Sequence, residues 1–78
     1  MRRTYITAVK PLDNYILQVD FKNGSRLYLN LAGKLKSLRF KPLGNPQIWE
    51  SARTDGVFVF FGSTEISHDE ILTLAEEV

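Results

Sequence analysis

The stretch YILQVDFKNGSRLYLNL, residues 15–31, decides the fold of this chain. Apolar and polar side chains alternate along residues 15–21 and again along residues 27–31, which is the period of a β-strand with one buried face. Asn23-Gly24 stands between the two runs, and this dipeptide is the strongest short-range signal of a β-hairpin. The stretch therefore predicts two antiparallel strands joined by a turn at Asn23-Gly24.

The two apolar rows also predict the length of the hairpin loop. A two-residue loop would pair Val19 with Tyr28 and would put the rows on opposite faces, because a one-residue shift reverses every side chain. A three-residue loop over residues 22–24 instead pairs Val19 with Leu27 and puts both rows on one face. We therefore predict a type I turn that ends in a bulge, with Gly24 in the left-handed conformation.

A strand is expected before this hairpin, and a weakly helical segment after it. The β-branched and aromatic residues 5–10 predict the strand, which Pro11 ends because proline cannot donate to a ladder. Within residues 32–44, Leu35 and Leu38 have helical spacing, but a glycine and a serine weaken it. A short helix or 3₁₀ turn followed by a loop is the prediction for this segment.

The second half predicts two helices and at least one strand. Asn45 as N-cap and proline in the first position predict a two-turn helix over residues 46–52. Residues 57–61, VFVFF, are apolar on both faces and predict an interior strand or a strand beneath a helix. Ser67 and Glu70 match a capping box, which predicts the start of a last helix.

The fold class that follows is α+β, in a single domain over residues 1–78. We expect a small antiparallel sheet of three N-terminal strands, then a short helix, one or two further strands and a C-terminal helix.

Composition excludes several classes of protein. The 78 residues include no cysteine, which excludes disulfides and thiolate-bound zinc and fits a cytoplasmic location. The longest apolar run, residues 57–61, is too short to span a membrane. No GxGxxG, P-loop or HExxH motif is present, and the one histidine, His68, is expected to be solvated in the first turn of the last helix. We therefore expect no catalysis, cofactor, metal or small-molecule substrate.

Residues 6–15, ITAVKPLDNY, and residues 19–24, VDFKNG, resemble the opening of the bacterial domain-of-unknown-function family numbered 2442. Asp55-Gly56 before an apolar strand, and residues 65–72, EISHDEIL, are similar to the closing strand and helix of that family. One departure is a phenylalanine near the end of the late strand, where the family often has tryptophan. The resemblance implies a small prokaryotic α+β fold without catalytic residues; some members look fused to a helix-turn-helix domain, and some appear near suspected toxin-like proteins.

Charge divides the chain into two unlike halves. Residues 1–41 carry nine basic and two acidic residues, a net charge of +7, whereas residues 42–78 carry one basic and seven acidic residues, a net charge of −6. Such asymmetry can mark a partner surface. The competing interpretation is that the two halves pack together and their charges compensate.

Protein interaction is the leading functional hypothesis. The edge strands of a small sheet invite pairing, and a chain of this length gains stability from association. We therefore expect an accessory or regulatory module that forms a homodimer or binds a genetically linked protein partner. Leu74 and Val78, on the last helix, are the candidate residues for self-association.

The alternative hypothesis is a nucleic-acid-binding accessory protein that uses the basic N-terminal half. Clustered basic residues hold phosphate, and an aromatic residue between them can stack on a base. The candidate contacts are Lys34, Lys36, Arg39, Phe40 and Lys41. Under the competing interpretation, Phe40 and Leu43 fold into the core beneath a solvated loop.

Overall fold

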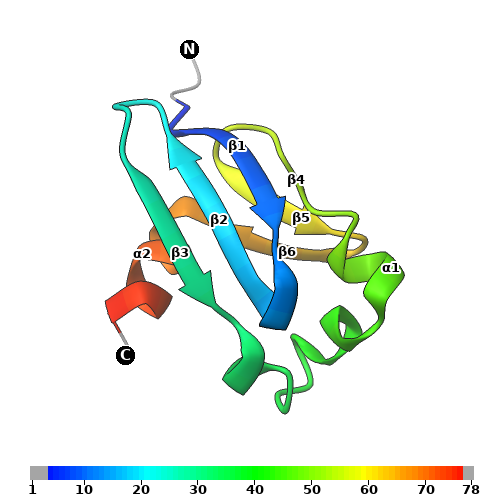
Figure 1. Ribbon diagram of the computed structural model, residues 1–78. Coiled ribbons are helices and arrows are strands. Elements are labelled where there is room, and N and C mark those ends of the chain that lie inside the picture. Colours follow the sequence, from blue (N-terminus) through cyan, green and yellow to red (C-terminus); the bar gives the residue numbers. More distant parts are fainter. Residues whose placement is uncertain (1–3, 77–78) are drawn as a thin grey trace.

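The computed structural model describes residues 4–76, which form two three-stranded antiparallel sheets and a C-terminal helix (Figure 1). The first sheet has the order β1-β2-β3, with β1 at Ile6–Pro11, β2 at Ile16–Phe21 and β3 at Arg26–Asn30. The second has the order β4-β5-β6, with β4 at Arg53–Thr54, β5 at Phe58–Phe61 and β6 at Thr64–Ser67. The C-terminal helix, α2, spans His68–Glu76. The α+β class is confirmed, but the later strands form a sheet of their own.

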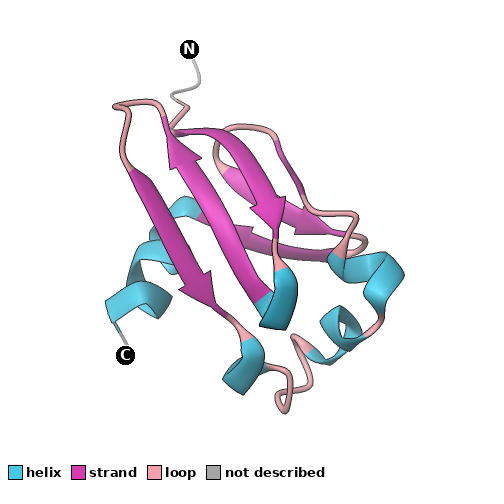
Figure 2. Ribbon diagram, viewed as in Figure 1, coloured by secondary structure: helices cyan, strands magenta, loops and turns pink. Residues whose placement is uncertain are grey.

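Short helices connect the strands and gather at the end of the molecule opposite the turn that joins β2 and β3 (Figure 2). Three are 3₁₀ turns: η1 at Asp13–Tyr15, η2 at Ala32–Lys34 and η3 at Lys41–Gly44. The fourth, α1, spans Pro46–Trp49. The Asn45 side chain caps α1 by accepting a hydrogen bond from the N–H of Gln47, as predicted.

The hairpin between β2 and β3 has the predicted three-residue loop. Val19 lies opposite Leu27 and Leu17 lies opposite Leu29, so both apolar rows share one face. Gly24 has a φ of +92° and donates its N–H to the carbonyl of Phe21 over 3.0 Å, which closes the turn. The left-handed glycine and the bulged loop are therefore confirmed.

The buried faces of the two sheets share one hydrophobic core with α2 and the short helices. Alternate residues of β2, β3 and β5 point into it, as the period-two pattern requires. Among its members are Leu17, Val19, Leu29, Leu31, Phe40, Leu43, Trp49, Val59, Phe61, Ile66 and Ile71. The strand β5 lies in the centre of its sheet, which confirms the expectation of an interior strand for this apolar run.

Gly56 joins the two sheets where β1 runs beside β4 (Figure 1). Its carbonyl accepts hydrogen bonds from the N–H groups of Tyr5, over 2.8 Å, and Ile6, over 2.9 Å. Its φ is +103°, and a Cβ at this position would lie 2.7 Å from Cγ2 of Thr4. Both the backbone conformation and the close approach of Thr4 therefore require glycine here.

Three local expectations were wrong. The helix α1 ends at Trp49, not at residue 52. Arg53–Thr54 adds a third strand to the one or two that were expected after the first sheet, because β5 offers these residues a ladder. A second 3₁₀ turn, Lys41–Gly44, lies where a loop was expected after β3, whereas the first, Ala32–Lys34, was predicted. Leu38 lies beyond that turn and is 90% exposed, so it does not continue the buried row.

Candidate functional site

Arg39 ties the basic half of the chain to the acidic half. Its guanidinium donates to both carboxylate oxygens of Glu70 and, over 2.8 Å, to the carbonyl of Glu65. The hydrogen bonds that Arg39 donates to the Glu70 carboxylate raise the pKa of Arg39 above its ordinary value. The charges of the two halves thus compensate each other at this point, and the Arg39 guanidinium is already bound within the chain.

The other candidate nucleic-acid contacts differ in their exposure to solvent. Phe40 is 5% exposed and belongs to the core, together with Leu43, so its ring does not reach a base. The proposed stacking role of Phe40 is therefore wrong, because the chain buries this ring. Lys34 is half-buried, whereas Lys36 and Lys41 are exposed on either side of the Arg39 segment.

A groove of about 660 Å³ is lined by residues of β3 and α2. Its apolar wall is formed by Leu27 and Leu29 on β3 and by Leu74 and Ala75 on α2. Leu74, one of the two predicted self-association residues, is half-buried there and packs against the core. The other, Val78, lies outside the described residues.

The backbone of β3 has an unpaired edge beside this groove. The pair Phe21 and Ser25 is hydrogen-bonded, so the alternation of an antiparallel ladder directs the N–H and C=O groups of every second residue of β3 away from β2. These residues are Arg26, Tyr28 and Asn30. Within residues 4–76, no backbone hydrogen bond joins these outward groups to another segment. Strand order decides which strand is an edge, and the sequence did not indicate it.

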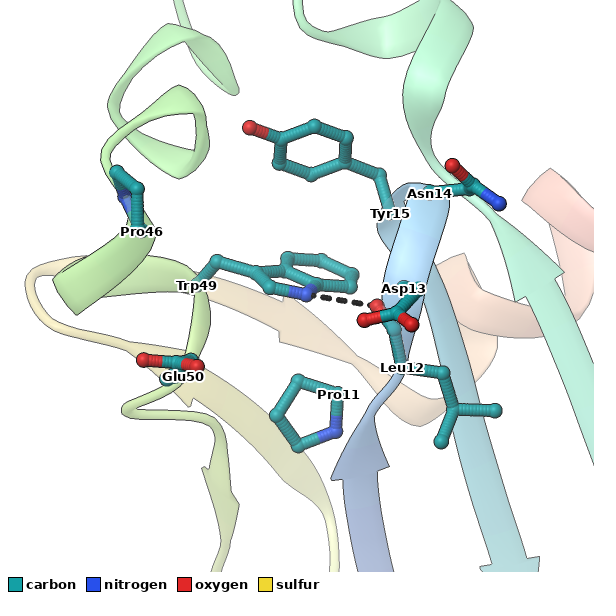
Figure 3. Close-up of a pocket in the computed structure, with 8 residues that line it drawn as sticks. All are labelled: Pro11, Leu12, Asp13, Asn14, Tyr15, Pro46, Trp49 and Glu50. Carbon is teal, nitrogen blue, oxygen red and sulfur yellow. Dashed lines mark hydrogen bonds between the residues drawn. The ribbon is translucent and has the colours of Figure 1, made fainter.

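A second hollow, the Trp49 pocket, lies between η1 and α1 (Figure 3). Its walls include Pro11, Tyr15 and Trp49, with Asp13 and Glu50 at its sides. The indole N–H of Trp49 donates to the carbonyl of Leu12 over 3.0 Å. Trp49 belongs to the hydrophobic core, and no pattern in the sequence indicated a pocket around it.

The loop that carries this pocket has an unusual backbone. Asn14 and Tyr15 have φ values of +63° and +59°, in the left-handed region that bulky side chains rarely adopt. The conformation brings the Tyr15 ring edge-on to Trp49, with ring centroids 5.2 Å apart. The Tyr15 hydroxyl also donates to the carbonyl of Gly44 over 3.3 Å. These contacts fix the wall of the pocket against α1.

His68 is not the solvated residue that the sequence suggested. Its ring stacks on Tyr5 with centroids 4.2 Å apart and meets Phe21 edge-on at 6.0 Å. Phe21 belongs to β2 and Tyr5 immediately precedes β1, so this contact anchors the start of α2 to the first sheet. Within residues 4–76, no group of three metal-ligating side chains is gathered at one place.

None of the helices in the described part of the chain has the length and apolar character needed to cross a membrane.

Comparison with known proteins yields a structural likeness. None of the family models compared matches the chain, so the resemblance to family 2442 stays a prediction. No curated protein matches it either. The fold is similar to the crystal structure of "Putative DNA Binding Protein NE0471" from Nitrosomonas europaea, with a TM-score of 0.76, 24% identity and 99% of this chain covered. The chain spans 54% of the length of that protein, and the likeness shows the fold.

Proposed function

We propose that this domain is a non-catalytic protein-interaction module that forms a homodimer through the outer edge of β3. The observation that carries the proposal is the row of outward N–H and C=O groups at Arg26, Tyr28 and Asn30, which find no backbone partner within residues 4–76. An unpaired strand edge of this kind is a ready template for another strand. We place the module in the bacterial cytoplasm, which the absence of cysteine fits.

A second copy of β3 matches this edge in chemistry. Antiparallel pairing about a two-fold axis at Tyr28 would set Tyr28 opposite its own equivalent and Arg26 opposite the second copy's Asn30. An aromatic pair stabilises such a ladder, and no like charges face each other. Asp20 already pairs with Arg26, so the edge carries no uncompensated positive charge at that residue. The same patch on both copies makes the contact isologous and closed.

The groove beside β3 supports the same interface. A sheet continued across the two-fold axis brings the apolar row of Leu27 and Leu29 in each copy next to that of the other. The half-buried Leu74 lies along the same groove and would be covered as well. A small domain gains stability when such apolar surface leaves water.

Substitution of Tyr28 by proline tests this interface without touching the core. The N–H of residue 28 points away from β2, so Tyr28→Pro removes a donor from the outer edge and leaves the β2–β3 ladder complete. Tyr28→Thr is the matched control, because threonine keeps the N–H and suits a strand. Light scattering across a concentration series measures the mass of each variant, and circular dichroism checks its fold.

We expect the unaltered chain and Tyr28→Thr to have twice the mass of one chain, and Tyr28→Pro to be a folded monomer. Dimer formation should change little with salt, because the contact is backbone and apolar. An unaltered chain that stays a monomer at high concentration, or a Tyr28→Pro dimer as tight as the original, would overturn the proposal.

Nucleic-acid binding is the second candidate, and the name of the Nitrosomonas europaea protein favours it. That protein is nearly twice as long as the match, and here Arg39 is bound to Glu70 while Phe40 is buried. Lys36 and Lys41 are the exposed cations left to contact phosphate in this segment. Fluorescence anisotropy with labelled duplex DNA tests the idea: binding that weakens with salt and is lost in Lys36→Ala/Lys41→Ala supports it. Binding that these changes leave intact contradicts it.

A further inference from the structure

The Trp49 pocket is a built feature, because its walls are fixed on two sides. Trp49 is held by its hydrogen bond to Leu12 and by stacking on Phe61, with ring centroids 5.3 Å apart. Tyr15 is held against it by the hydrogen bond to Gly44. The pocket therefore exists before any ligand arrives, which lowers the entropic cost of binding.

Two unpaired carboxylates line this pocket. Asp13 and Glu50 make no ion pair or side-chain hydrogen bond within residues 4–76, whereas Asp20 and Glu70 each pair with an arginine. Figure 3 shows Asp13 and Glu50 on opposite sides of the pocket, with Trp49 and Pro11 between them. The pocket thus combines apolar walls with negative charge on two sides, so a cation with an apolar flank matches it.

The size of the pocket restricts the ligand further. Its volume is about 180 Å³, whereas sites for drug-sized molecules and cofactors enclose roughly 300–1,000 Å³. One long side chain fits such a space. A guanidinium suits the walls better than an ammonium, because it is planar, more weakly hydrated, stacks on rings and donates in two directions.

We propose that the Trp49 pocket binds the guanidinium side chain of an arginine presented by a partner protein. The planar group lies against the Pro11 ring and the small part of Trp49 that stays exposed, and its N–H groups donate to Asp13 and Glu50. The pocket shares no residue with the β3 edge, so this inference stands or falls independently of the homodimer.

Trp49 is the one tryptophan of the chain, so its fluorescence reports on this pocket directly. The probe is arginine with an acetylated amino group and an amidated carboxyl group, which imitates a residue within a protein. The matched control ligand is the same derivative of citrulline, which has nearly the same shape but no charge. A single side chain should bind with a Kd on the order of 1 mM.

Substitutions of the two carboxylates complete the test. We expect Asp13→Asn and Glu50→Gln each to raise the Kd about three- to fivefold, and the double variant to abolish saturation. Glu65→Gln, the same change outside the pocket, should leave the Kd unaltered. Free arginine should bind no more tightly than the blocked form, because a site for a residue within a protein makes no use of the free α-ammonium and α-carboxylate.

Four outcomes would overturn the inference. They are no saturable fluorescence change with blocked arginine, equal binding of the citrulline derivative, the same Kd in the double variant, and tighter binding of free arginine. The last would indicate a small-molecule site in place of a protein contact. Because Asp13 and Glu50 are exposed, their variants should fold, and circular dichroism verifies this.

Discussion

The guanidinium of Arg39 and the carboxylate of Glu70 join the basic and acidic halves of the chain through two hydrogen bonds. Glu70 was expected to complete a capping box at the start of α2, and Ser67 does cap that helix by accepting from the N–H of Glu70 over 3.1 Å. The Glu70 side chain, however, turns to Arg39. At least part of the charge asymmetry of the sequence is therefore compensated within the chain.

The Arg39–Glu70 pair should contribute little to the free energy of unfolding. The two side chains are 49% and 28% exposed, and exposed pairs are worth less than about 1 kcal/mol. A double-mutant cycle with Arg39→Gln and Glu70→Gln, measured by urea unfolding, should give a coupling energy of about 0.5 kcal/mol that falls with added salt. Lys36→Gln is the control and should leave stability unchanged. A coupling energy of zero would contradict the pairing.

Gly24 should resist substitution because of its backbone alone. A Cβ at Gly24 would meet no atom within 4 Å, and the same is true at Gly33, but only Gly24 of these two has a positive φ. Gly24→Ala should therefore cost about 1–2 kcal/mol, whereas Gly33→Ala should be neutral or slightly stabilising. Thermal or urea unfolding of the two variants measures the difference. Equal costs would show that the turn tolerates another conformation.

Gly56→Ala should be more damaging than Gly24→Ala. The left-handed penalty of about 1–2 kcal/mol applies at both positions, and at Gly56 the new methyl group also collides with Thr4. Overpacking of this kind adds about 1–3 kcal/mol. Thr4→Gly removes the colliding atoms. The double variant should therefore recover the stability lost to overpacking, but should keep the cost of the left-handed backbone. If Thr4→Gly brings no recovery, the collision is not the cause.

Ser67→Ala should destabilise the start of α2. The Ser67 hydroxyl accepts the N–H of Glu70, and loss of such a cap costs about 1 kcal/mol. Ser67→Asp should retain most of the stability, because aspartate caps as well as serine does. Ser63→Ala, at the exposed turn before β6, is the control. Hydrogen exchange of the first α2 amides should rise in Ser67→Ala, and unaltered exchange would argue against the cap.

The sequence predicted well those features that neighbouring residues determine. The hairpin loop followed from the two apolar rows and Asn23-Gly24, and both caps followed from Asn45 and Ser67 with their neighbours. The second sheet was not predictable in the same way. Its first strand, Arg53–Thr54, forms only because β5 lies beside it.

The candidate sites were harder to predict for the same reason. Phe40 carried a signal for nucleic-acid contact, yet burial among core residues decides its role. The Trp49 pocket depends on a left-handed pair, Asn14 and Tyr15, whose conformation is stabilised by contacts with Gly44 and Trp49 some thirty residues away. Long-range contacts of this kind leave no local pattern in the sequence.

The bonds from Tyr5 and Ile6 to the carbonyl of Gly56 also bear on how the chain reaches its fold. The hairpin of β2 and β3 uses contacts close in sequence and can form early, whereas this junction closes a loop of about fifty residues and forms late. During synthesis, β1 can pair with β2 but must wait for the second sheet to cover its other side. Until then β1 is an exposed edge, and in that interval the nascent chain is most open to aggregation.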